Sequence, residues 1–197
     1  MMIMPANNGK GIVHYWAGRF PGRIGWLMSP FSWKTPPSYM PYAIDNGAFT
    51  RWEPDRFMKI LRLSLRNHRP MWIIVPDVVG DAEATLRKWH FWARRVAPFG
   101  PLAFAAQDGM EPSDVPPEAF CTFIGGSTKF KGQAERFKGV APWLHVGRVN
   151  GAGRLRWAKE IGADSVDGTG FFRGATAMDS KATLIEMVEG QKQGEMF

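Results

Sequence analysis

One pattern recurs along this chain: a short, β-rich apolar run that ends in a polar or glycine-containing cluster. Several runs are nearly uninterrupted, such as MWIIV and LAFAA. Strands buried on both faces, as in parallel sheets, have this composition, whereas strands with one wet face alternate. Eight runs can be marked, at 12–17, 24–29, 42–46, 72–77, 102–107, 121–126, 143–148 and 164–168. We therefore expect a parallel sheet of up to eight strands.

Helical periodicity separates the later runs. One amphipathic pattern follows Pro54, a second follows Asp81, and a third ends near Gly162. Strands that alternate with helices predict an α/β fold, and eight of them predict a compact (β/α)8 TIM-like barrel. The first two runs leave no room for a helix between them, so we expect the barrel to be irregular at its start. An open doubly wound sheet is the alternative.

Length and apolar content fit one domain over residues 1–197. The formal net charge is +7, which favours an anionic partner, with nucleic acid as the first candidate and an ordinary basic soluble protein as the alternative. Cys121 is the only cysteine, which excludes an intrachain disulfide and a multi-cysteine zinc site and suits a reducing cytoplasm. No apolar run is long enough for a membrane span, and the N-terminus lacks the apolar core of a signal peptide.

The chemistry of a parallel barrel lies on the loops at the C-terminal ends of its strands. Three aspartates follow the apolar runs directly, one glutamine occupies a similar place, and a glycine pair follows another run. These residues are Asp45, Asp77, Asp167, Gln107, Gly125 and Gly126. Each aspartate alone is typical of a helix cap or turn. As a set they predict one shared pocket.

The residue types suggest different chemical uses. A carboxylate can attack an anomeric carbon, and a second can move a proton to or from a departing base. A third can accept hydrogen bonds from the N1–H and amino group of guanine, while the glutamine amide can donate to a carbonyl. A glycine pair leaves backbone N–H groups open to a flat ligand.

The strand-end segments together resemble the tRNA-guanine transglycosylase family, and within it the small phage relatives that insert 7-deazaguanines into DNA. Five segments correspond, in family order, over residues 44–173. IDNGAF is similar to DSGGFQ, VPDVV to the strand end whose aspartate reads guanine, AAQDG to VQGG, and IGGS to the GGL turn. The segment from HVGRVNGAGR to SVDGT is similar to MGVGTPEDLLEAVARGVDMFDCVLPTR, whose last aspartate is the nucleophile.

The resemblance implies Asp167 as the nucleophile and Asp45 as the general acid/base. It implies that Asp77, Gln107, Gly125 and Gly126 contact the base. Asn46 stands where the family has serine, so contacts to the substrate edge are expected to differ. The family's zinc-binding C-x-C-x-x-C region is missing, which favours DNA or a smaller substrate over tRNA.

The reaction implied is replacement of guanine in nucleic acid by a 7-deazaguanine base such as preQ0, in the cytoplasm of a bacterial host if the chain is phage-encoded. No cofactor is required, and the histidines show no metal-ligand spacing. His145 has either a supporting role beside the site or a place in the core. The sequence leaves open whether a partner protein or a second copy of the chain completes the nucleic-acid channel.

Basic residues on or beside the strand-end loops are candidates for contacts to the phosphate backbone. They are Arg51, Lys129, Lys131, Arg148 and Arg173. Lys88, on a predicted helix, is expected on the plain outer surface. Two alternatives to base exchange remain open: a hydrolytic nucleoside or DNA glycosylase with nearly the same residues, and a non-catalytic nucleic-acid-binding module.

Overall fold

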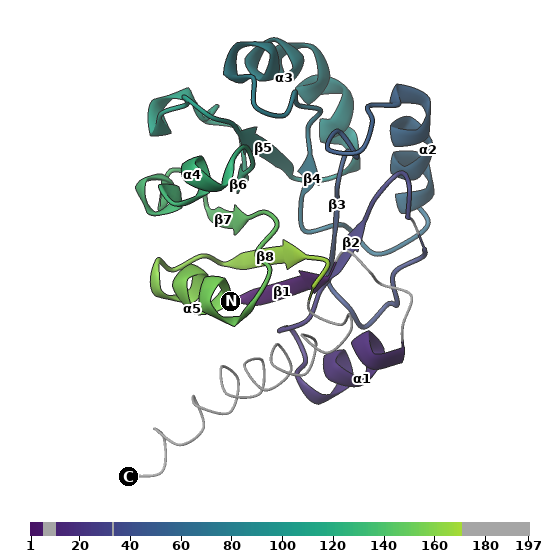
Figure 1. The fold of residues 1–197 in the computed structure, drawn as a ribbon. Coiled ribbons are helices and arrows are strands. Elements are labelled where there is room, and N and C mark those ends of the chain that lie inside the picture. Colours follow the sequence, from purple (N-terminus) through teal and green to yellow (C-terminus); the bar gives the residue numbers. More distant parts are fainter. Residues whose placement is uncertain (6–10, 33, 171–197) are drawn as a thin grey trace.

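A computed structural model describes residues 1–5, 11–32 and 34–170. Eight parallel strands form one sheet in the order β1-β8-β7-β6-β5-β4-β3-β2, with the helices outside the ring of strands (Figure 1). The strands are β1 (Met2–Pro5), β2 (Trp26–Met28), β3 (Tyr42–Ile44), β4 (Ile73–Ile74), β5 (Leu102–Ala106), β6 (Cys121–Ile124), β7 (Trp143–Val146) and β8 (Ser165–Gly168). The α-helices are α1 (Gly11–Arg19), α2 (Pro54–Ser64), α3 (Ala82–Val96), α4 (Thr128–Lys131) and α5 (Ala152–Glu160).

The two ends of the sheet meet through a short parallel bridge between Ile3 of β1 and Ile24, just before β2. Ile3 N donates to Arg23 O over 2.9 Å, and Gly25 N donates to Ile3 O over 2.9 Å. These bonds bring the sheet round into a nearly closed ring. The predicted compact (β/α)8 barrel is confirmed.

The prediction of a strand at 12–17 is wrong. This segment lies in α1, and the first strand is the MIMP segment of β1, which is only four residues long and ends in proline. A helix therefore does connect β1 to β2. The irregular connection lies one step later, where the proline-rich segment leads from β2 to β3 and its described residues form neither helix nor strand.

Local signals account for the later helices. Pro54 occupies the first turn of α2, where its missing N–H has no helical partner to lose. The Asp81 carboxylate accepts a hydrogen bond from Ala84 N over 2.9 Å and caps α3. Gly162, with φ of 76°, follows α5 in the left-handed conformation that commonly ends a helix.

The core has two layers because side chains alternate along each strand. An inner cluster comes from the strands and their flanks and fills the barrel; it comprises Met2, Met4, Leu27, Ala43, Trp72, Ile74, Ala103, Ala105 and Cys121. A larger cluster joins the outer strand faces to the helices, through residues such as Phe57, Trp89 and Leu155. The alternation continues past the strand ends, so that Asp45 follows inward-facing Ala43 and Gln107 follows inward-facing Ala105.

Within the described residues, no helix is long and apolar enough to cross a membrane.

Candidate active site

A cavity of about 500 Å³ opens at the C-terminal ends of the strands. Its lining includes every residue predicted to act on the base or the sugar, namely Asp45, Asn46, Asp77, Gln107, Gly125, Gly126 and Asp167. These residues come from β8 and from the loops that follow β3, β4, β5 and β6. The prediction that the strand-end residues share one pocket agrees with this geometry.

Two side-chain amides hold Asp77 in place. Asn46 Nδ2 donates to Asp77 Oδ1 over 2.7 Å, and Gln107 Nε2 donates to Asp77 Oδ2 over 2.7 Å. The backbone fixes which way each amide faces, because Asn46 Oδ1 accepts from Ala48 N and Gln107 Oε1 accepts from Gly80 N. Each carboxylate oxygen retains a lone pair for a ligand donor. Burial raises the pKa of Asp77, and the Asn46 amide and the Lys88 ammonium oppose this effect.

Asp45 lies at the end of β3, where its Oδ1 accepts a hydrogen bond from Gly47 N over 3.1 Å. Burial, reinforced by the negative charges of Asp167 and Asp77, raises the pKa of Asp45 to about 7. A carboxyl group with this pKa is present in both protonation states near neutral pH. That property suits a group that gives a proton in one step and takes one in the next.

The carboxylate of Asp167, on β8, accepts one hydrogen bond on each oxygen. Arg148 N donates to Oδ1 over 3.0 Å, and His145 Nε2 lies 3.0 Å from Oδ2. Only 6% of the Asp167 residue surface is exposed, so the carboxylate meets the cavity through a small opening. This arrangement fixes the carboxylate plane and leaves its outer face for a substrate atom.

A hydrogen-bond chain behind Asp167 holds His145 in place. Trp143 Nε1 donates to Ser165 Oγ over 2.7 Å, and His145 Nδ1 lies 2.7 Å from the same oxygen. Among the described residues the Ser165 hydroxyl has no other acceptor, so it donates to His145 Nδ1. Nε2 of His145 then faces Asp167 Oδ2 as the hydrogen-bond donor.

The fold has solved counterparts. Neither family models nor curated protein sequences match this chain. A solved structure of native KDPGal is similar over 97% of this chain and 95% of its own, with a TM-score of 0.57 and 13% identity. A cube-shaped, highly porous cage designed by fusing symmetric oligomeric domains matches 98% of this chain and 73% of its own, with a TM-score of 0.52 and 15% identity. At such identities the likeness shows a shared fold.

The glycine pair after β6 has a packing role. A Cβ on Gly125 would lie 2.8 Å from Gln107 Nε2, and one on Gly126, whose φ is 64°, would collide with the Asp108 carboxylate. Gly125 N–H donates to Ala106 O over 2.9 Å, so of the two expected open N–H groups this one is already engaged. If this pair donates a backbone hydrogen bond to a base, the donor is therefore the N–H of Gly126.

The predicted phosphate-binding residues separate in space. Lys131 and Arg148 line the active-site cavity, and Lys131 Nζ donates to Gly126 O over 2.9 Å. Arg51 lies outside that lining and pairs with Glu53. Arg173 lies outside the described residues.

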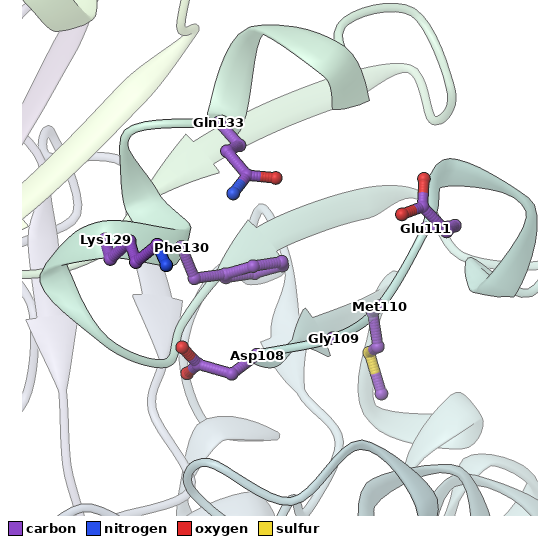
Figure 2. A pocket seen from close by; sticks show the side chains of 7 residues that line it. All are labelled: Asp108, Gly109, Met110, Glu111, Lys129, Phe130 and Gln133. Atoms are coloured by element: carbon purple, nitrogen blue, oxygen red, sulfur yellow. The ribbon is translucent and has the colours of Figure 1, made fainter.

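Lys129 belongs to a different cavity, of about 230 Å³. Figure 2 shows it there with Phe130, Gln133 and Asp108, so the cavity is lined by the loop after β5 and by α4 and the residues just after it. The Asp108 carboxylate accepts hydrogen bonds from Ser127 N and Oγ, and Glu111 pairs with Arg136. The two acidic side chains of this cavity are thus engaged by neighbouring residues outside its lining.

Lys88 contacts the backbone of the site residue Asp77, which the sequence did not indicate. Although it lies on α3, its Nζ donates to Asp77 O over 2.9 Å and sits 4.8 Å from the centre of the Trp52 ring. The expectation of a plain outer-surface lysine is wrong, because the side chain reaches back over the end of β4. Among the described residues, no group of three or more histidine, cysteine, aspartate or glutamate side chains could hold a metal ion.

Proposed function

We propose that this protein is a base-exchange glycosyltransferase that replaces guanine in a nucleic acid with a 7-deazaguanine. The observation that carries this proposal is the convergence of Asp45, Asp77 and Asp167 on one cavity, each in a different environment. Asp77 faces two amides, Asp45 has a pKa near 7, and Asp167 is oriented by a histidine and a backbone N–H. These environments suit a base reader, a proton carrier and a nucleophile, respectively.

The reaction has two displacement steps. The target nucleotide leaves its stack, because C1′ is out of reach of such a cavity inside a duplex. Asp167 Oδ attacks C1′, the glycosidic C–N bond breaks, and the departing guanine takes a proton from Asp45. The incoming 7-deazaguanine gives a proton to Asp45, its nitrogen attacks C1′, and the bond to Asp167 breaks. Two inversions give net retention, as in retaining glycosidases.

The cavity is large enough for this chemistry. Small-molecule sites in proteins have volumes of about 300–1,000 Å³, and the cavity of about 500 Å³ lies within that range. Its acidic side accepts the donor edge of guanine, and its basic side, with Lys131 and Arg148, suits the anionic backbone. DNA is favoured over tRNA as substrate because the family's zinc-binding region has no counterpart in the sequence.

The test is incubation of a guanine-containing oligonucleotide with a labelled 7-deazaguanine such as preQ0. We expect label in the oligonucleotide and an equal amount of free guanine. Asp167→Asn should abolish incorporation, while Asp55→Asn, the same change at an exposed position in α2, should leave it intact. Release of free guanine without incorporation of label would mean that the protein hydrolyses the glycosidic bond and does not exchange the base. Oligonucleotide binding with neither product would indicate a non-catalytic binding module.

A further inference from the structure

A second, smaller pocket lies beside the active site, between α4 and α5. Its volume is about 140 Å³, well below the roughly 300 Å³ at which small-molecule sites begin. Lys131 and Arg148 line this pocket as well as the active-site cavity, so the two spaces share a wall. Thr128 and Arg154 complete its polar lining. The space suits a compact polar group and excludes a base.

The pocket concentrates positive charge. Three cations, Lys131, Arg148 and Arg154, contribute to its lining, which contains no aspartate or glutamate. Within the part of the chain that the structure describes, none of the three forms an ion pair with a carboxylate. Arg148 and Arg154 are exposed, so solvent screens part of the repulsion among the three charges, and an anion bound in the pocket would reduce the remaining repulsion.

Of the three cations, Lys131 gives the strongest argument for a bound anion, because it is only 7% exposed. Burial and the charge of Arg148 lower the pKa of this lysine, which reports the same repulsion. Its ammonium carries three donors, and the one hydrogen bond that it makes to a described residue goes to Gly126 O. Two donors therefore remain for a ligand at the wall between the pocket and the active site.

The position in the barrel points to the same ligand. Barrel enzymes frequently bind phosphate with the loops that follow strands 7 and 8. Here the segment Gly147–Val149, directly after β7, forms part of the pocket. The backbone N–H of Arg148 also donates to Asp167, so an anion in the pocket would lie on the nucleophile's side of the active site.

We propose that this pocket binds a phosphate group of the nucleic-acid substrate, next to the nucleotide whose base is exchanged. The inference rests on the proposed function and deepens it. The phosphate anchors the sugar on the side of Asp167, while Asp77 and Gln107 hold the base on the side of β4 and β5. Arg154 is the new binding residue, since it lines this pocket and not the active-site cavity.

The first experiment measures equilibrium binding of a single-stranded oligonucleotide at several salt concentrations. Arg154→Gln should weaken binding roughly tenfold and reduce the slope of log K against log salt by about one. The matched control is Arg156→Gln, an exposed arginine on the same helix that does not line the pocket. Equal effects of the two substitutions would overturn the proposal.

The second experiment identifies the source of the phosphate. A single neutral methylphosphonate linkage beside the target guanosine should weaken binding to the wild-type protein but add little to the Arg154→Gln defect. If a neutral linkage at every position tested weakens binding by Arg154→Gln as much as it weakens binding by the wild type, the pocket does not hold the backbone. If binding of inorganic phosphate depends on Arg154 but binding of the oligonucleotide does not, the site takes a free phosphate and the nucleic-acid assignment is wrong.

Both experiments measure binding, and a comparison with base exchange by the same variants separates this inference from the proposed function. If the protein binds the phosphate as described but exchanges no base, the pocket still binds phosphate and the proposed reaction is wrong. If the Arg154→Gln and Arg156→Gln variants exchange base equally well at limiting oligonucleotide, the proposed reaction stands and the phosphate-binding role of the pocket is wrong.

Discussion

His145 Nε2 lies 3.0 Å from Asp167 Oδ2, and the histidine has no solvent exposure. Its ring stacks on Phe123 with the centroids 4.8 Å apart and an angle of 13° between the planes. Its other nitrogen, Nδ1, lies 2.7 Å from Ser165 Oγ, and this oxygen accepts a hydrogen bond from Trp143 Nε1. Stacking on Phe123 therefore fixes the plane of the imidazole, and the contact with Ser165 fixes which ring nitrogen faces Asp167. A carboxylate oriented in this way keeps one geometry toward the cavity.

The first prediction concerns His145 as a positioning residue. His145→Phe removes the N–H that orients Asp167, and we expect kcat for base exchange to fall about 10- to 100-fold, as is typical when such a supporting group is lost. KM for the oligonucleotide should change little, since His145 does not line the cavity. His145→Gln, whose amide can restore a donor, should recover part of kcat. An equal loss in both variants, or a loss confined to KM, would assign His145 a merely structural role.

The second prediction concerns the pH dependence of exchange. Loss of solvent around the carboxyl group, together with the negative charges of Asp167 and Asp77, raises the pKa of Asp45 to about 7. If it transfers the proton in both half-reactions, kcat should vary with pH around a value near 7. The measurement is single-turnover exchange between pH 5 and 9. A profile that is flat across this range, as expected if the carboxyl titrated near the usual aspartate value of about 4, would show that Asp45 is not the proton carrier.

The third prediction links the same group to stability. The folded state holds the Asp45 proton more tightly than the unfolded chain, whose aspartates have a pKa near 3.8. The proton-linked stability is therefore present below pH 3.8 and is lost as pH rises to about 7. Asp45→Asn removes this loss, so the variant should gain about 1–3 kcal/mol relative to wild type between pH 5 and pH 8.

Urea unfolding of both proteins at the two pH values tests the linkage. Asp55→Asn serves as the control, because it makes the same chemical change at an exposed position on α2. A stability difference between Asp45→Asn and wild type that is the same at both pH values would contradict the raised pKa.

Much of the active site could be predicted from the sequence because a strand has a period of two. Asp45, Gln107 and Asp167 each follow an inward-facing strand residue by two positions, so their direction is set by the strand before them. The strand β1 escaped prediction because it has four residues and ends in proline. The run at 12–17 has an apolar composition that a helix and a strand can share.

The supporting contacts depend on tertiary structure that no local pattern carries. Ser165 meets His145 because β7 and β8 pair with these two residues in register. Lys88 reaches Asp77 because α3 returns over the end of β4. Arg148 and Arg154 face the same pocket because α5 packs beside the loop after β7. Sequence patterns place residues on elements, whereas these contacts follow from how the elements pack.

The last prediction concerns a buried hydroxyl in the core. Thr122 of β6 has no solvent exposure, and its Oγ1 has no hydrogen-bond partner among the described residues. Burying such a group without a partner costs free energy, so Thr122→Val, which has nearly the same shape, should stabilise the protein by up to about 1 kcal/mol. Urea unfolding should show a higher midpoint with an unchanged slope.

Thr85 provides the matched control. Its Oγ1 accepts from Val78 N over 3.0 Å and lies 3.1 Å from Val78 O, to which it donates. Thr85→Val makes the same chemical change but leaves Val78 N without its partner, while Val78 O keeps its hydrogen bond from Asp81 N, so it should destabilise by about 1–3 kcal/mol. Opposite signs for the two substitutions are the expected result, because only one of the hydroxyls is bonded. Destabilisation of similar size in both would mean that the Thr122 hydroxyl has a partner in solution.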